Sequence, residues 1–478
     1  MESLSTDVLL ALPEVFMLAA ASIVLLVGLY SGRSSEPVAY VLTLATLVTT
    51  AALVYFTASP VKTFAFGGMY LSDPLSQAIK LFSCLTVAAV MLYARPYLRA
   101  RTHLSAEFYA LGLFATMGTL VMASAYNFVL IYLGLELLSL CLYALVAFVR
   151  NSLDASEAAI KYFVLGAIAS GMLLYGMSIM YGLTGSLDLT EINAYLGQTQ
   201  ANRVALVFAL AFIVVGLAFK FGAVPFHMWV PDVYQGAPTA ITLFIATMPK
   251  FAAFVMAIRL LSHGLQELLV DWQQMLMVLT VLSVVFGNVV AIAQSNIKRM
   301  LAYSAISHIG FILLGILPGT DFGYAAAFFY TVIYVLMAAG TFGALILLGD
   351  HDREMDQLVD LKGLGKISPW FALILLVLMF SMAGVPLTVG FYAKLYILQS
   401  LVYDGLVWVA VLAVVMSVVG AFYYLRVVKY MYFDEAEHSF QRQPSVLAQT
   451  VLSVNGLLVV GLFIFPNALL NYCVQVLG

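Results

Sequence analysis

The feature that most constrains this chain is a succession of apolar runs, each about 20 residues long, that fills nearly all of the sequence. Of its 478 residues, 63% are hydrophobic and only 9% are charged, whereas a soluble domain carries roughly 25% charged residues. Runs of this length can cross the hydrocarbon core of a bilayer as helices. The pattern excludes a soluble enzyme, a nucleic-acid-binding protein and a disordered chain, and predicts an all-α polytopic membrane protein.

The breaks between the runs predict fourteen transmembrane helices. We expect them near residues 8–30, 37–57, 74–93, 107–124, 127–149, 160–182, 204–231, 238–261, 272–293, 301–317, 323–348, 369–401, 405–432 and 446–472. The run at 74–93 gives the weakest signal, because Gln77 and Lys80 lie inside it. No basic residue precedes the first run, which is unlike a cleaved signal peptide, so we expect that run to remain as a helix.

The positions of the basic residues support this count and predict an orientation. Predicted loops on the side away from the termini hold 14 of the 21 Lys and Arg residues, and loops on the side of the termini hold Lys62, Arg203 and Arg259. Because basic loops stay in the cytoplasm, both termini are expected on the periplasmic side of a bacterial inner membrane. The three cysteines are widely spaced inside apolar runs and form neither a metal motif nor a disulfide framework.

Two predicted helices are too long and contain a proline beside a glycine. The interruptions are Gly222–Pro225 and Gly384–Pro386, in the seventh and twelfth helices. Proline removes a backbone hydrogen bond and clashes with the preceding turn, so a helix breaks there. The two broken helices cross in opposite directions, which predicts two inverted repeats with a working site near the midplane. We expect a three-helix segment at 1–106, repeats at 107–261 and 262–432, and a C-terminal helix at 433–478.

Several ionisable side chains lie far from the ends of their predicted helices. A charge at the bilayer centre costs about 2.5–3.5 kcal/mol even on lenient scales, so these residues are candidates for function: Glu136, Lys220, Lys250, His308 and Lys394. Glu136, for example, lies roughly 14 Å beyond the start of its run. Burial in a medium of low dielectric constant lowers the pKa of a lysine and raises the pKa of a glutamate. Both residue types can then gain or lose a proton near neutral pH. The row predicts a proton relay rather than a sodium site, which needs clustered oxygen ligands.

Other polar residues allow more than one interpretation. Lys161, beside a basic loop, either reaches the interface or assists the relay, and His227 either caps the first broken helix or takes part in the relay. His308 could also be a satisfied interior histidine. Lys80 is predicted to extend its ammonium group to the membrane interface. Glu14 is predicted to lie at the interface in a first helical turn.

Two segments resemble signature sequences of the antiporter-like subunits of respiratory complex I. They are Trp229–Thr239 (WVPDVYQGAPT) and Asn296–His308 (NIKRMLAYSAISH), and Lys220 followed by Pro225–His227 (PFH) fits the same family. The resemblance covers residues 107–426. Within this family, Lys394 in the broken twelfth helix makes the chain similar to the N-type subunit (subunit 2 in mitochondria), since the M-type places a glutamate there. The L-type carries a long lateral helix after the last span, and we expect none here.

The resemblance implies a subunit of NADH–quinone oxidoreductase that couples remote electron transfer to proton pumping. It implies that Glu136, Lys220, Lys250 and Lys394 match the family's proton-channel residues, with His308 in the axis that connects them. FMN, the iron–sulfur clusters and the quinone are then expected in other subunits, and no cofactor or metal in this chain. The implied partners are a neighbouring antiporter-like subunit, small membrane subunits and the lipid bilayer, with no nucleic acid. The alternative is a stand-alone or multisubunit cation/proton antiporter of related fold.

Overall fold

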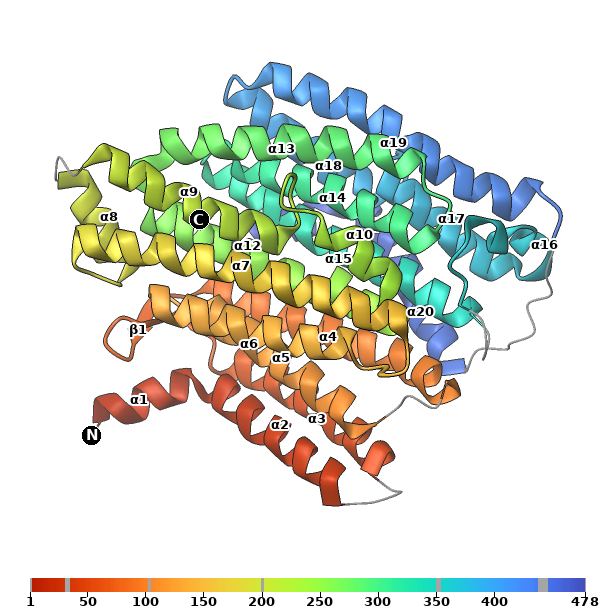
Figure 1. Ribbon diagram of the computed structural model, residues 1–478, viewed down its shortest axis with the longest axis horizontal. Coiled ribbons are helices and arrows are strands. Elements are labelled where there is room, and N and C mark those ends of the chain that lie inside the picture. The colour runs from red at the N-terminus through yellow and green to blue at the C-terminus, as the bar shows by residue number, and fades with distance from the viewer. Residues whose placement is uncertain are drawn as a thin grey trace.

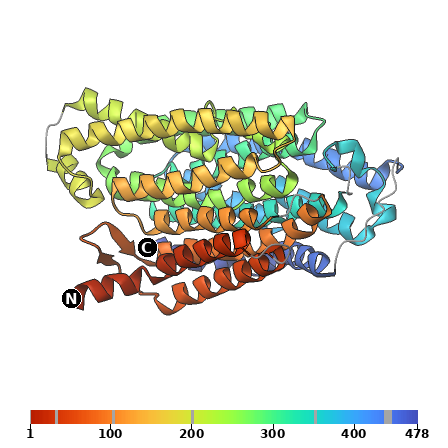
Figure 2. The same cartoon turned by 60° about the horizontal axis from the view of Figure 1, so that its bottom comes forward.

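The computed structural model describes residues 2–30, 35–101, 105–198, 202–349, 354–436 and 446–477. Long helices run side by side in one bundle, and both ends of the chain lie at the same end of it (Figure 1 and Figure 2). This placement agrees with an even number of crossings. Three residues of the predicted basic loops, Arg33, Arg353 and Arg442, lie outside the described residues.

Thirteen helical stretches in the described chain are long and apolar enough to cross a membrane. They are α2 (Leu12–Tyr30), α3 (Ser35–Phe56), α4 (Pro74–Ala100), α5 (Ala106–Ser124), α6 (Phe128–Val146), α7 (Leu153–Thr184), α9 (Arg203–Phe221), the stretch Thr239–Gly264, the stretch Gln266–Ile292 containing α13 (Leu269–Ile292), α14 (Ile297–Ile316), α15 (Asp321–Leu348), α19 (Val407–Phe433) and α20 (Val446–Ile464). The half-helices α17 (Pro369–Ala383) and α18 (Val389–Tyr403) together supply a fourteenth crossing. The predicted all-α architecture is confirmed.

The two predicted helix breaks share one local geometry. Helix α9 ends at Phe221, and Gly222 follows in the left-handed conformation with φ of 83°. Helix α17 ends at Ala383, and Gly384 follows with φ of 85°. In each case the glycine N–H and the next N–H both donate to the same helical carbonyl, that of Ala218 or Phe380. Glycine adopts this conformation without a steric penalty, and its recurrence in two half-helices supports the inverted repeats.

The structure departs from several predicted boundaries: α7, for example, begins at Leu153 rather than near residue 160, and three further departures concern capping or interruption of a helix. The weakest run forms the continuous helix α4, because Asp73 and Ser76 cap its start through a reciprocal capping box. The eighth crossing is interrupted at Thr247, between α11 (Thr239–Ala246) and α12 (Met248–Ala257), and then continues as a π-helix over Ile258–Gly264. The last predicted helix is two helices, because Pro466 begins α21 (Pro466–Leu477).

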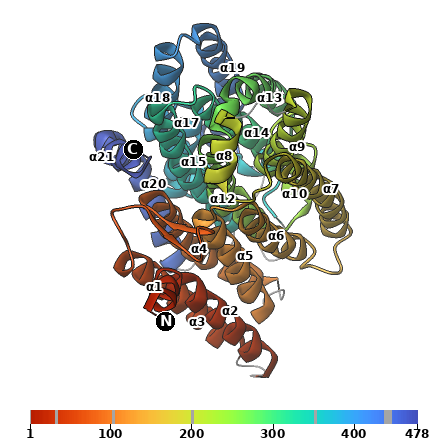
Figure 3. The ribbon, with the colours of Figure 1, turned by 90° about the vertical axis from the view of Figure 1, so that its left-hand side faces the viewer.

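Smaller elements decorate the ends of the bundle. They are α1 (Glu2–Leu10), the antiparallel strands β1 (Thr63–Ala65) and β2 (Tyr70–Ser72), α8 (Leu189–Gln198), α10 (Trp229–Gly236), the 3₁₀ turns Gln266–Leu268 and Leu358–Leu361, and α16 (Leu364–Ile367). Helices α14 and α15 lie near the centre of the bundle in the end-on view (Figure 3). They are 94% and 83% buried inside the chain, whereas α2 and α20 are only 33% and 28% buried. The central helices are therefore shielded from lipid by the protein itself.

Candidate functional site

The first candidate group lies where α9 breaks. Lys220 is the last residue but one of α9, and its Nζ donates to Ser139 Oγ on α6 at 2.8 Å. Ser139 lies one turn along α6 from Glu136, whose Oε1 is buried without a hydrogen bond to the described residues. Glu136 and Lys220 do not form an ion pair. The structure adds the Ser139 hydroxyl, a partner of Lys220 that the sequence had not singled out.

Lys250 lies on α12 and reaches back to the same break. Its side chain is 1% exposed, and its Nζ donates to the carbonyl oxygen of Phe221 at 3.4 Å. Phe221 is the last residue of α9. The C-terminal carbonyls of a helix carry a partial negative charge, equivalent to roughly half an elementary charge. The ammonium group therefore meets the negative end of a broken half-helix.

Lys394 repeats this arrangement in the second repeat. It lies on α18, and its Nζ donates to the carbonyl oxygen of Ala383 at 2.9 Å. Ala383 is the last residue of α17, the other half-helix that ends in a left-handed glycine. The same Nζ lies 5.2 Å from the centre of the Phe311 ring. A helix terminus stabilises a nearby cation by up to about 2 kcal/mol, so it offsets part of the cost of burying each lysine.

His308 lies in the buried centre of the bundle, on α14. Its Nδ1 hydrogen-bonds to the Tyr330 hydroxyl at 2.7 Å, and its Nε2 to the Tyr424 hydroxyl at 3.0 Å. The Tyr330 ring stacks on Phe311, with centroids 5.7 Å apart. Phe311 in turn carries Lys394 on its face. The five predicted residues therefore form two groups: Glu136, Lys220 and Lys250 around the first break, and His308 and Lys394 beside the second.

The two accessory candidates lie outside these groups. The Lys161 side chain is 42% exposed and forms ion pairs with Glu157 at 2.8 Å and Asp232 at 2.7 Å. The half-buried His227 ring packs against Phe286, with centroids 4.9 Å apart, in the turn that follows the first break. Neither residue makes a hydrogen bond to a member of the relay row among the described residues.

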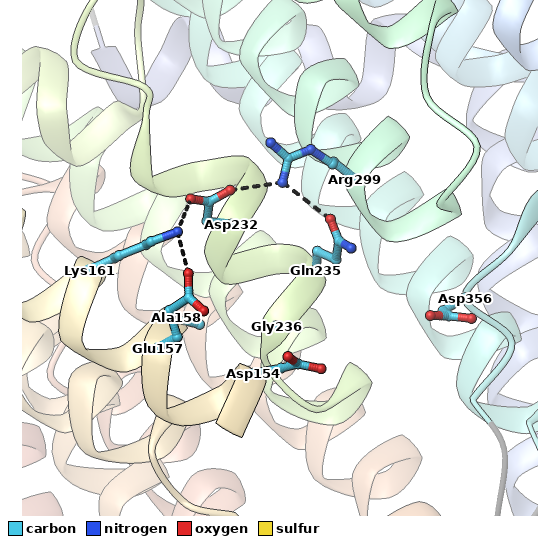
Figure 4. A pocket seen from close by; sticks show the side chains of 9 residues that line it. All are labelled: Asp154, Glu157, Ala158, Lys161, Asp232, Gln235, Gly236, Arg299 and Asp356. Carbon is cyan, nitrogen blue, oxygen red and sulfur yellow. Dashed lines mark hydrogen bonds and ion pairs between the residues drawn. The ribbon is translucent and has the colours of Figure 1, made fainter. Parts of the chain in front are cut away.

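Lys161 lines a polar pocket of about 260 Å³ at the end of the bundle opposite the termini. Figure 4 shows Asp232 between Lys161 and Arg299, and Arg299 also donates to Gln235 at 3.2 Å. Two further carboxylates, Asp154 and Asp356, border the pocket. Among the described residues, no group of three or more His, Cys, Asp or Glu side chains is placed to hold a metal ion.

The prediction for Lys80 is wrong, and the prediction for Glu14 holds only for its place in the chain: Glu14 lies in the first turn of α2, but its side chain is buried. Lys80 is 3% exposed, and its Nζ lies 2.6 Å from Glu14 Oε1 in a buried ion pair. The Tyr70 hydroxyl accepts from Lys80 at 2.9 Å and donates to Glu14 at 3.2 Å. The lysine does not reach for the interface because a carboxylate from the first turn of α2 meets it inside the protein. The two residues are 66 positions apart in the sequence, so no local sequence pattern predicts this ion pair.

Arg259 was expected in a loop, and it too is buried. It is 0% exposed, and its two terminal nitrogens donate to the Asp73 carboxylate at 2.7 and 2.8 Å. Burial alone would raise the pKa of Asp73, but the Arg259 guanidinium and the Ser76 N–H lower that pKa to about 2. This ion pair ties the start of α4 to the π-helical end of the eighth crossing.

The fold and these groups define a class of protein: a multi-pass membrane protein with two inverted repeats, in which buried lysines meet the ends of broken helices. The sequence model of the NADH:quinone oxidoreductase/Mrp antiporter transmembrane family matches residues 125–420. NADH-quinone oxidoreductase subunit N of Thioalkalivibrio sulfidiphilus is 56% identical over 466 residues, which cover 97% of each chain. The chain belongs to the NADH-quinone oxidoreductase subunit N family.

Solved structures support the same assignment. A chain of respiratory complex I from Thermus thermophilus matches with a TM-score of 0.81 and 32% identity, covering 96% of this chain and 98% of that one. A chain of the Mrp complex from Dietzia sp. matches with a TM-score of 0.84 over 98% of this chain, but at 19% identity it shows the fold alone. The resemblance to N-type subunits predicted from the motifs is confirmed.

Proposed function

We propose that this chain is a proton-translocating membrane subunit of an NADH-quinone oxidoreductase. In this proposal, protons move along Glu136, Lys220, Lys250, His308 and Lys394, driven by electron transfer from NADH to quinone in other subunits. Lys161 and His227 have accessory roles outside the row. The observation that carries the proposal is that a lysine in each repeat, buried Lys250 and half-buried Lys394, donates to the terminal carbonyl of a broken half-helix.

The partners of these lysines suit groups that gain and lose protons. Lys220, Lys250 and Lys394 each donate to a neutral oxygen atom, of a hydroxyl or a backbone carbonyl. A lysine paired with a carboxylate is held in its charged form by a full opposite charge, as Lys80 is by Glu14. A neutral acceptor exerts no such hold, because it can remain beside either the ammonium or the amine. These neutral acceptors therefore lower the cost of burying each lysine in the membrane, and they leave each lysine able to gain or lose a proton.

Glu136 supplies a means of control. At an effective dielectric constant of about 20, a carboxylate about 4 Å from Lys220 would stabilise its charged form by about 4 kcal/mol. That is comparable to moving one charge against roughly 170 mV, at about 2.3 kcal/mol per 100 mV. Glu136 and Lys220 are not paired in this structure, so a small movement of α6 toward α9 would change the charge balance at Lys220.

The proposed location of the cofactors and the proposed partners follow if the chain is one subunit of an NADH-quinone oxidoreductase. FMN, the iron–sulfur clusters and the quinone site belong to other subunits, and this chain performs no redox chemistry. Its partners are a neighbouring antiporter-like subunit and small membrane subunits. The excess of basic residues at the end opposite the termini supports periplasmic termini in a bacterial inner membrane. The repeats are assigned to residues 107–261 and 262–432, between segments 1–106 and 433–478.

The test is proton translocation per NADH oxidised, in membrane vesicles with the assembled complex. Lys250→Ala should lower this ratio several-fold, and Lys161→Ala, which removes an exposed lysine of the polar pocket, should lower it much less. Equal ratios for Lys250→Ala and the unchanged complex would contradict the relay. The alternative, an autonomous cation/proton antiporter, predicts that the purified chain in liposomes exchanges Na⁺ or K⁺ for protons with no redox partner, and we expect no exchange.

A further inference from the structure

We infer that Ser304, Tyr424 and Tyr330 form with His308 one hydrogen-bonded chain that conducts protons through the second repeat. The inference rests on the proposed function and adds three residues to it. Tyr424 comes from α19, Tyr330 from α15, and Ser304 from the turn of α14 that precedes His308. The consecutive helices α14 and α15 and the more distant helix α19 therefore place four exchangeable groups in a row.

The contacts along the row are continuous. The Ser304 hydroxyl lies 2.5 Å from the Tyr424 hydroxyl, which lies 3.0 Å from His308 Nε2. The opposite ring nitrogen, Nδ1, lies 2.7 Å from the Tyr330 hydroxyl. All four side chains are at most 3% exposed. They are therefore withdrawn from lipid and from the surrounding solvent.

Counting hydrogen atoms shows why this row can conduct. A neutral imidazole donates from one nitrogen and accepts at the other, and each hydroxyl donates one hydrogen and can also accept. When Nδ1 carries the hydrogen, Ser304 donates to Tyr424, Tyr424 donates to Nε2, and Nδ1 donates to Tyr330. When Nε2 carries the hydrogen, every one of these bonds points the other way. The structure accommodates both arrangements with the same heavy-atom positions.

Passing from one arrangement to the other moves one proton. A proton that arrives at Ser304 Oγ releases the Ser304 hydrogen to Tyr424, and the Tyr424 hydrogen passes to His308 Nε2. The Nδ1 hydrogen then passes to Tyr330, and the Tyr330 hydrogen is taken up by the uncharged amine of Lys394, the next group of the proposed relay. Each O–H or N–H bond that breaks is replaced, so one proton enters, one leaves, and no charge remains. The row is reset without moving a proton backwards when the three hydroxyl groups rotate and the imidazole ring turns so that its protonated nitrogen faces Tyr330 again.

The two ends of the row lie in different surroundings. Ser304 is one turn closer than His308 to the start of α14, and thus to the end of the bundle opposite the termini. Tyr330 lies flat against Phe311, and the centre of the Phe311 ring lies 5.2 Å from Lys394 Nζ. The row therefore joins the side of the polar loops to the neighbourhood of Lys394.

The experiment removes single hydroxyl groups in the intact complex. Tyr424→Phe, Tyr330→Phe and Ser304→Ala keep the buried shape and should each lower protons translocated per NADH several-fold while NADH oxidation continues. Ser304→Thr restores a hydroxyl and should recover much of the ratio. The matched control is Tyr93→Phe, since Tyr93 on α4 is fully buried and its hydroxyl makes no hydrogen bond to the described residues. This variant should keep the unchanged ratio.

The variant His308→Gln distinguishes the proposed relay through His308 from the conducting row of four side chains. If it lowers the ratio while the three hydroxyl deletions do not, the conducting row is wrong and the relay stands. If His308→Gln also translocates normally, the proposed relay through His308 fails. Should Tyr424→Phe prevent assembly, Ser304→Ala decides the matter, because it interrupts the same row without changing an aromatic ring.

Discussion

Replacing Lys80 with methionine should destabilise the part of the bundle that contains α2 and α4, because the Glu14 carboxylate would remain buried without its cation. In the structure the two charges are 2.6 Å apart and nearly inaccessible to solvent. At an effective dielectric constant of about 20, their attraction is worth about 6 kcal/mol. Burying two ions costs several kcal/mol each, so the intact pair adds little net stability. Removing one member is different and costs about 3–5 kcal/mol.

The double variant Lys80→Met with Glu14→Met isolates this effect. It replaces both charges by apolar side chains of similar length, a change that is often neutral or stabilising for a buried pair. The Tyr70 hydroxyl stays satisfied, because in the double variant its single hydrogen can be donated to the carbonyl oxygen of Leu10, 3.0 Å away, instead of to Glu14. We therefore expect Lys80→Met alone to be much less stable than either the unchanged chain or the double variant.

Cys84 provides the assay. It lies on α4 one turn after Lys80, and it is a free cysteine that is 1% exposed. With Cys141 and Cys473 replaced by alanine, labelling by a maleimide reports local opening around the ion pair. A loss of about 3–5 kcal/mol should speed labelling by about two to three and a half orders of magnitude, at about 1.4 kcal/mol per tenfold. Equal labelling rates for Lys80→Met and the unchanged chain, or no recovery in the double variant, would refute the reasoning.

Further predictions concern the relay and the second buried ion pair. Glu136→Gln should severely lower protons per NADH in assembled complexes and Glu136→Asp should lower it partially, whereas a normal ratio for the glutamine variant would leave Glu136 a structural role only. Lys394→Ala should assemble but translocate poorly, and Lys394→Glu should retain more activity because it still titrates; equal ratios would argue against titration. Ser139→Asp should place a carboxylate beside Lys220 and block translocation, while Ser139→Asn should be milder. The Asp73 carboxylate should contribute about 2 kcal/mol of stability, fully present above about pH 4 and lost toward pH 2, because its pKa of about 2 lies below the ordinary 3.8. In thermal unfolding, Asp73→Asn should therefore differ from the unchanged chain at pH 7, and a difference that shrinks between pH 8 and pH 5 would contradict this.

The sequence predicted those parts of the fold and site that depend on local chemistry. The breaks after Phe221 and Ala383 follow from glycine and proline within a few positions, and a lysine deep in an apolar run is conspicuous wherever its partner lies. The interruption at Thr247 had a signal as well, since Pro249 follows two positions later. What the pattern could not supply was pairing over long separations. The ion pairs Lys80–Glu14 and Arg259–Asp73 form only once the helices have packed.

This difference separates two kinds of buried cation that look alike in the sequence. Lys80 and Arg259 meet carboxylates near the end of the bundle that holds the termini, and each pair joins two segments that would otherwise be free to part. Lys250 and Lys394 instead donate hydrogen bonds to backbone carbonyls, at points where a helix is interrupted. A full opposite charge fixes a protonation state and suits a structural joint, whereas the partial charge of a helix end makes burial tolerable without fixing it. In the proposed relay, the ability of a lysine to carry protons therefore depends less on its depth in the membrane than on the charge of the atom that accepts its hydrogen bond.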